Sequence, residues 1–155
     1  MCGLRSLLRR LPWASVLAAA MTAVCLAVGS IAYAEPPLAP VSGKVTYDDD
    51  SLIPGARIQL VFIPLGQVPQ GQSAPRPSIA DVDVENGGFK SMSTYRQGDG
   101  ASVGHHRVMV TVLGPDAKLN GAVPAVFSDP ATTPLRIEVE NRRNWIHFQL
   151  PKPEQ

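Results

Sequence analysis

Hydrophobic and polar residues alternate along most of the chain beyond residue 40. The alternation is clearest in 107–113, where Val108, Val110 and Val112 occupy every second position. Successive side chains of a strand point to opposite faces, so the valines are expected to face a core and the residues between them to face away. The segment is therefore predicted to be a half-buried β-strand.

The same period of two recurs in short segments separated by turns rich in glycine, proline and asparagine. The predicted strands cover 41–47, 56–63, 78–85, 89–95, 107–113, 135–139 and 145–150. Asn86-Gly87-Gly88 is a tight-turn signal that predicts a hairpin between the third and fourth strands. No segment has a convincing helical period. The pattern predicts an all-β fold, a seven-stranded antiparallel β-sandwich of immunoglobulin-like form.

Two further expectations concern the surface of the predicted sandwich. Two long connections, 65–77 and 114–133, are expected to form the variable working surface, because loops on a rigid scaffold carry recognition. Asp81, Asp83 and Glu85 share one face of their predicted strand. We interpret that face as the solvated one, which protects a sheet edge against aggregation.

The first 34 residues have the features of an export signal. Three arginines within the first ten residues precede an almost uncharged run over 13–33, which ends in the small-x-small pattern Ala32-Tyr33-Ala34. Type I signal peptidase accepts this pattern. We expect residues 1–34 to be a signal peptide and the protein to be periplasmic or extracellular. The alternative is an uncleaved membrane anchor through residues 13–33, because the apolar run is long enough to span a bilayer.

Both cysteines, Cys2 and Cys25, lie in the predicted signal segment. A lipid-anchored form through Cys25 is a weaker option, because Val24 is large for the position before a lipobox cysteine. After cleavage the protein would contain no disulfide, no thiol nucleophile and no cysteine metal site.

The remaining residues suit a single domain. We expect a proline-rich tether over 35–40, the sandwich over 41–151 and a tail over 152–155. All 13 acidic residues follow the signal segment, which itself holds three of the 14 basic residues. The exported part would therefore be slightly negative, which does not suggest nucleic acid or an anionic membrane surface as a partner.

Three blocks of sequence carry a family resemblance. They read VSGKVTYDDDSLIPGARIQLVFIP, ADVDVENGGFKSMSTYRQGDGASVGHHRVMVTV and VPAVFSDPATTPLRIEVENRRNWIHFQL. The positions that match the family pattern are Pro54, Gly55, Ala56, Gly88, Phe89, Gly98, Asp99, Gly100, Ala101, Gly104, Pro124, Phe127, Asp129, Pro130, Thr132 and Thr133. In this order the blocks resemble the carboxypeptidase regulatory-like domain of the transthyretin-like superfamily, in the form carried by small exported bacterial proteins and lipoproteins.

The resemblance covers nearly all of the chain after the signal segment. It departs at Glu85 and Asn86, where aspartate is usual, and at His106, where an aromatic residue is more usual. The resemblance implies a non-catalytic β-sandwich used for rigidity, spacing or attachment. The family pattern contains no catalytic residue that could be assigned to this chain.

The histidines are the first candidates for chemistry. His105 or His106 with Asp99 could hold a metal ion for a metal-assisted hydrolase. Adjacent strand residues point to opposite faces, however, so the two histidines are not expected to bind one ion together. His106 lies two residues before Val108, so its side chain is expected on the same face of the strand as the core valines, which favours a position at the core edge. Asp48, Asp49 and Asp50 could hold calcium, but a solvated turn is the simpler interpretation.

Trp145 is the candidate for a ligand-binding surface. It is predicted to share an outer face with His147, and with Tyr47 or Tyr95 it could form an aromatic platform for a sugar ring. Motifs for serine hydrolases, phosphate loops and haem attachment do not occur in the chain. The sequence thus predicts an exported, non-catalytic module with a structural or binding role at the cell envelope and no cofactor. Its partner would be an envelope protein or a polysaccharide, and the alternatives are a metal-assisted hydrolase and a carbohydrate-binding module.

Overall fold

The computed structural model describes residues 34–68 and 70–153. The predicted signal segment and the predicted anchor over 13–33 lie outside these residues, apart from Ala34, so both stay predictions. Within the described ranges the chain forms strands and one short 3-10 helix, η1 (Ala125–Ser128), and contains no α-helix. In the same part of the chain, no helix is long and apolar enough to cross a membrane.

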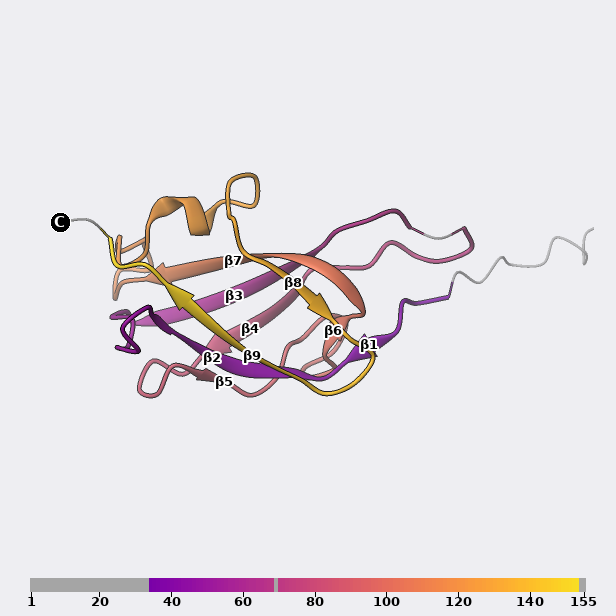
Figure 1. Ribbon diagram of the computed structural model, residues 1–155, viewed down its shortest axis with the longest axis horizontal. Helices are drawn as coiled ribbons and strands as arrows, with labels where there is room; N and C mark the ends of the chain where they lie inside the picture. The colour runs from indigo at the N-terminus through magenta and orange to yellow at the C-terminus, as the bar shows by residue number, and fades with distance from the viewer. Residues whose placement is uncertain (1–33, 69, 154–155) are drawn as a thin grey trace, which may run out of the picture. The chain divides into compact units, whose positions relative to one another are not determined.

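The strands form two larger sheets and one small one (Figure 1). The four-stranded sheet has the order β4 (Ser78–Val82), β3 (Arg57–Pro64), β7 (Gly104–Leu113) and β8 (Arg136–Val139). The three-stranded sheet has the order β5 (Gly88–Phe89), β2 (Val41–Tyr47) and β9 (Asn144–Leu150). The small sheet pairs β1 (Leu38–Ala39) with β6 (Ala101–Ser102).

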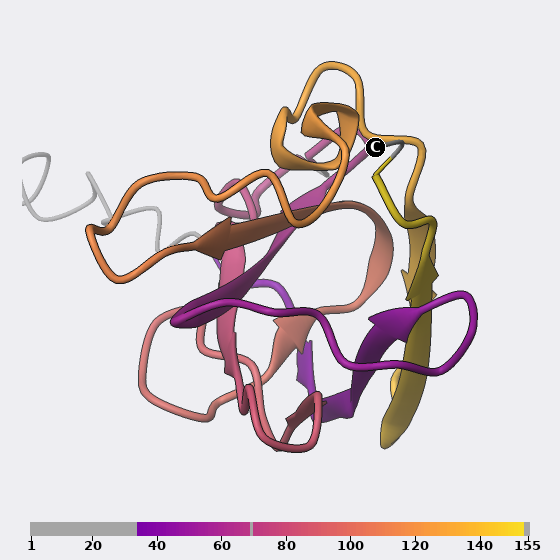
Figure 2. The same cartoon turned by 90° about the vertical axis from the view of Figure 1, so that its left-hand side faces the viewer.

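The two larger sheets pack face to face around one apolar core. Figure 2 shows β2 and β9 on one side and β3 and β7 on the other. Inward-facing residues alternate along the long strands as predicted, except at the end of β2, where Val45, Thr46 and Tyr47 are all buried. The inward-facing apolar residues of both sheets belong to a single buried cluster. Phe62 of β3 meets Phe148 of β9 edge to face, with ring centroids 6.0 Å apart. The fold is therefore all-β and sandwich-like, as the alternation predicts.

The strand count corrects the prediction of seven, because the described residues contain nine strands. The additional strands β1 and β6 are two residues long, too short to show a period. The first of them falls in the predicted tether, where the Ala39 side chain is buried. Its pairing with Ala101 ties the end of the tether to the domain.

The direction of one strand pair is also corrected. The first long strand, β2, and the last, β9, run parallel, whereas the alternation in the sequence predicts an antiparallel sandwich. Alternation shows which face a residue occupies but not which strand lies beside it, so it carries no information on direction. A Cβ at Gly43 would lie 1.9 Å from the Ile146 carbonyl oxygen, so this close approach requires glycine.

The predicted hairpin over 78–95 is formed only in part. β4 ends at Val82, and β5 pairs with β2 in the other sheet, where Phe89 lies opposite Gly43. The chain then returns, and Ser93 bridges to Ile79 of β4. The segment predicted as one strand therefore crosses between the sheets, because residues 88–89 have a partner far away in the sequence.

Candidate functional site

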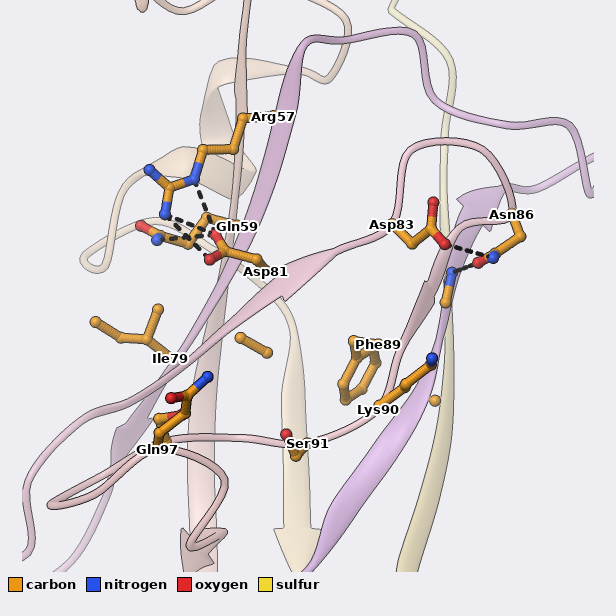
Figure 3. A pocket seen from close by; sticks show the side chains of 14 residues that line it. Arg57, Gln59, Ile79, Asp81, Asp83, Asn86, Phe89, Lys90, Ser91 and Gln97 are labelled. Atoms are coloured by element: carbon orange, nitrogen blue, oxygen red, sulfur yellow. Dashed lines mark hydrogen bonds and ion pairs between the residues drawn. The ribbon is translucent and has the colours of Figure 1, made fainter.

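A hollow of about 690 Å³ lies where the chain leaves β4 for the other sheet (Figure 3). Its floor includes the apolar residues Ala80 and Phe89, both buried. Polar side chains surround this floor, together with Ile79, an exposed apolar residue. The hollow is thus a polar depression with a small apolar base.

The backbone beside the hollow has an interrupted hydrogen-bond ladder. Ile79 and Ser93 exchange two backbone hydrogen bonds of 2.9 and 2.8 Å. Four residues further on, the Asp83 N–H donates to the Gly88 carbonyl oxygen at 2.8 Å. Alternate residues of a strand present their backbone groups to the same edge, so the N–H and C=O of Asp81 face this gap.

The side chains around the hollow fall into two groups. Arg57 donates to both carboxylate oxygens of Asp81 at 2.9 and 3.1 Å, and Gln59 donates to one of them at 3.4 Å. Across β4, Asn86 donates to Asp83 at 2.6 Å, and Lys90 lies nearby (Figure 3). The ion pair is exposed, and exposed pairs contribute about 0–1 kcal/mol to stability. Arg57 and Asp81 can therefore exchange partners with a polar ligand at little cost to the fold.

Sequence reasoning missed this site. It interpreted Asp81 and Asp83 as a solvated face, but it did not place Arg57 and Gln59 beside them. The parity of Arg57 and Gln59 shows that both face outward from β3, so part of the signal is present in the alternation. The pairing of Gln59 with Asp81 depends on strand register, which the sequence does not reveal.

Asp99, a candidate metal ligand, holds a backbone turn. Its carboxylate accepts the N–H groups of Thr94, Tyr95 and Arg96 at 2.7, 2.9 and 2.8 Å. Burial alone would raise the pKa of Asp99, but these donors outweigh it and lower the pKa below its ordinary value. A carboxylate with three backbone donors is engaged in stabilising the turn.

His106 lies in the core edge, as its parity predicts, and its side chain is 1% exposed. Its Nε2 is 3.0 Å from the Ser102 hydroxyl, and its Nδ1 is 2.9 Å from the Gly104 carbonyl oxygen. The carbonyl can only accept, so Nδ1 carries the proton and Nε2 accepts from Ser102. Burial lowers the pKa of His106, which favours this neutral form.

His105 points to the opposite face and is exposed, opposite Glu138 of β8. Within residues 34–68 and 70–153, no group of three or more His, Cys, Asp or Glu side chains could hold a metal ion. The three candidates His105, His106 and Asp99 are therefore not brought together into such a group. In the Asp48–Asp50 turn, Asp49 accepts from Ser51 and from Lys152, and Lys152 is the main cause of its low pKa of about 2.

Trp145 is 68% exposed on the outer face of β9, beside His147 at a ring-centroid distance of 6.1 Å. Tyr47 does not join this face, because it is buried and donates to the Ala122 carbonyl oxygen at 2.5 Å. Tyr95 is half-buried under Arg76, whose guanidinium carbon lies 5.2 Å from the ring centroid. Of the predicted platform, the structure shows Trp145 and His147 side by side, whereas Tyr47 and Tyr95 are engaged in other contacts.

The two long connections differ in their contacts. The connection over 114–133 packs along β7, where Ser128 donates to the Val110 carbonyl at 3.0 Å and Thr133 donates to the Val108 carbonyl at 2.7 Å. This connection therefore covers a strand edge as well as forming surface. The connection over 65–77 projects from β3 and β4, and its Gly71 and Ser73 bond to Ala34 (Figure 1).

Comparisons with known proteins give one distant structural likeness. No protein-family model matches the chain, and no curated protein matches it. A DUF3823 family protein from Parabacteroides merdae is similar to this chain with a TM-score of 0.38 and 13% sequence identity. The match covers 76% of this chain and 47% of that one. A likeness at this level carries no argument about function.

Proposed function

We propose that this protein is an exported, non-catalytic β-sandwich module with a structural or binding role at the cell envelope. The observation that carries the proposal is that the candidate catalytic groups Asp99 and His106 are hydrogen-bonded to other groups of the fold. Asp99 accepts three backbone N–H groups, and both ring nitrogens of His106 are hydrogen-bonded. The resemblance to carboxypeptidase regulatory-like domains, which are generally non-catalytic, supports the same conclusion.

The binding surface in this proposal is the hollow beside β4. The ion pair between Arg57 and Asp81 supplies both charges there, and Gln59 and Lys90 add hydrogen-bond donors. Such a surface suits a polar segment of an envelope protein or the hydroxyl groups of a polysaccharide. The interrupted ladder at Asp81 adds one backbone donor and one acceptor.

Affinity capture from the envelope fraction tests this surface. The full chain, wild type or Asp81→Lys, is used as bait, with Asp116→Lys as a matched control at an exposed position outside the hollow. We expect a partner that the wild type and the control retain and Asp81→Lys loses. Equal retention by all three proteins would show that the hollow is not the binding surface.

Metal analysis tests the competing hydrolase. We expect purified protein to hold far less than one zinc ion per chain, because Asp99 and His106 are engaged in the scaffold. His105→Ala, which alters an exposed side chain, serves as the variant least disturbing to the fold. One zinc per chain in the wild type, lost in His105→Ala or His106→Ala, would establish a metal site and overturn the proposal.

Export is tested by fractionation of cells that produce the full chain with a C-terminal tag. We expect the tagged protein in the periplasmic or extracellular fraction, with a mature N-terminus at Glu35. An intact N-terminus in the membrane fraction would favour the uncleaved anchor. Protein confined to the cytoplasm would contradict export.

The exposure of Trp145 beside His147 favours carbohydrate binding as the second candidate function. A sugar ring stacked on the indole would change the fluorescence of Trp145. Titration with a panel of polysaccharides tests this, with Trp145→Phe as the control. No change specific to Trp145 would eliminate the carbohydrate-binding module.

A further inference from the structure

The four strands that end the two larger sheets protect their free edges to different degrees. The edge of β4 is bridged by Ser93, and β8 alternates the charged residues Arg136 and Glu138. The edge strand β5 is only two residues long. Charge, coverage and short length are the usual protections of a sheet edge against pairing with another chain.

The fourth edge strand, β9, has none of these protections in the part of the chain that the structure describes. It is seven residues long, reads NWIHFQL and contains no Asp, Glu, Lys, Arg or Pro. It pairs with β2 on one side and ends the three-stranded sheet on the other. A long edge without Asp, Glu, Lys, Arg or Pro is a template for another strand.

The hydrogen bonds to β2 determine which residues of β9 face the open edge. The Asn144 N–H donates to the Pro40 carbonyl at 2.9 Å, and the Leu150 carbonyl accepts from Asp48 at 2.9 Å. The Ile146 carbonyl also lies against β2, at Gly43. Alternation along the strand then directs the backbone N–H and C=O groups of Trp145, His147 and Gln149 toward the open edge.

We propose that this edge forms a symmetric dimer, in which β9 of a second copy adds antiparallel with the two His147 residues opposite each other. Residues opposite each other in an antiparallel pair exchange two hydrogen bonds only when both present their backbone groups to the shared edge. Centring on His147 satisfies this condition at all three edge-facing positions, because Trp145 then lies opposite Gln149 of the partner subunit. If the register is shifted by one residue, none of the three edge-facing residues lies opposite another edge-facing residue.

The side chains agree with this register on both faces of the sheet. On the outer face, the exposed Trp145 ring would cover Gln149 of the partner subunit. On the inner face, the half-buried Ile146 would lie opposite Phe148 of the partner subunit, which extends the apolar core across the interface. Each copy of β9 supplies both members of these pairs, Trp145 with Gln149 and Ile146 with Phe148, so a second copy of the chain provides a complementary strand. Two-fold dimers are also the commonest protein oligomers.

Disulfide trapping tests the dimer and its register. The full chain, with Cys2→Ser and Cys25→Ser, carries either His147→Cys or the matched control Gln149→Cys, both on the same exposed face. In the proposed register the two Cα atoms at position 147 lie about 5.5 Å apart, within reach of a disulfide. The two at position 149 are offset by four residues, about 13 Å along the strand, and are out of reach.

We expect mild oxidation to produce covalent dimer from His147→Cys at least ten times faster than from Gln149→Cys. Association through residues outside β9 would not bring the two copies of position 147 closer together than the two copies of position 149. Such association would therefore not produce this difference in rate. Equal rates, or no dimer from His147→Cys, would overturn the proposal. A monomeric wild type by sedimentation at the same concentrations would point instead to a strand from a different protein.

A pair of charge variants provides a second test that does not depend on cysteine. Trp145→Glu with Gln149→Glu places like charges opposite each other in the dimer, whereas Trp145→Glu with Gln149→Lys places opposite charges there. We expect the first double variant to dissociate at least ten times more readily than the second. Circular dichroism confirms that both remain folded, and equal dissociation would contradict the register.

Discussion

At the scale of single residues, the sequence GDGA at 98–101 shows how a scaffold can resemble a catalytic loop. Gly98 and Gly100 have φ angles of 74° and 105°. A Cβ at Gly100 would lie 2.4 Å from the Ala39 carbonyl oxygen, so the glycine lets β1 approach. Asp99 between them accepts backbone N–H groups of the turn. The Asp99 carboxylate of this loop therefore stabilises a backbone turn.

Removing the charge of Asp99 is expected to destabilise the fold. Asp99→Asn keeps the shape but weakens three charge-assisted hydrogen bonds, for an expected loss of about 1–3 kcal/mol at pH 7. The lowered pKa of Asp99 makes this contribution complete above the unfolded pKa of about 3.9, and it is lost as the pH falls through the folded pKa. Urea unfolding at pH 7 and pH 3 measures the difference, which should shrink at pH 3. A constant difference would contradict the charge-based explanation.

His106 is expected to make stability depend on pH in a higher range. Burial lowers its pKa in the folded state, so below the unfolded pKa of about 6.5 the unfolded chain binds more protons. Stability should therefore fall with decreasing pH below about 6.5, by up to about 1.4 kcal/mol per pH unit. Thermal unfolding between pH 7.5 and 5.5 measures this slope. His106→Gln should remove it, whereas His105→Gln, at an exposed position, should retain it.

At the scale of elements, the edge of β7 shows which parts of the fold the sequence can predict. Its valines alternate as expected, and each of the four long strands β2, β3, β7 and β9 begins and ends within three residues of its predicted range. β8 pairs with only the first four residues of β7. The connection over 114–133 bonds to the remaining edge through the hydroxyl groups of Ser128 and Thr133 and the backbone N–H of Asn120, contacts that no local pattern reveals.

The same limit applies to the parallel pairing of β2 with β9 and to the hollow beside β4. Alternation predicts the buried face of each strand, because burial depends on local period. It does not predict partners distant in sequence, such as Phe89 opposite Gly43, because those depend on how sheets assemble. The hollow results from such a long-range pairing. The faces of their strands on which His106 and Trp145 lie, in contrast, follow directly from the alternation of residues along each strand.

Loss of one edge hydroxyl is expected to weaken the sandwich measurably. Thr133 is buried, and its hydroxyl donates to the Val108 carbonyl at 2.7 Å. Thr133→Val preserves the shape of the side chain but leaves that carbonyl without its donor, so we expect a loss of about 1–3 kcal/mol. Thr132→Val is the matched control. The Thr132 hydroxyl donates to the Val126 carbonyl at 3.1 Å, but at an exposed position where water can replace the donor, so the substitution should change stability by less than about 0.5 kcal/mol. Equal urea midpoints for the two variants would contradict the assigned role of Thr133.

At the scale of the whole molecule, residues 35–40 are attached to the sandwich through the small sheet of β1 and β6. Ala39 is 1% exposed, and the Val103 N–H donates to the Pro37 carbonyl at 3.0 Å. Ala34, in contrast, is exposed and joins the connection over 65–77 through two hydrogen bonds of 3.3 and 3.1 Å. Among residues 34–40, the contacts with the sandwich therefore lie after the predicted cleavage site.

Two truncated chains test this division. A chain that begins at Glu35 loses only the contacts of Ala34 among those described, so its stability should match a chain beginning at Tyr33 within about 0.5 kcal/mol. A chain that begins at Val41 loses β1, its ladder with β6 and the burial of Ala39, for an expected cost of about 2–4 kcal/mol. Urea unfolding of the three proteins measures both differences. If the chain that begins at Val41 were as stable as the others, 35–40 would act as the simple tether that the sequence predicts. If the chain that begins at Glu35 were destabilised as well, cleavage after Ala34 would remove part of the folded domain, and an uncleaved N-terminal segment would become the better explanation of this end of the molecule.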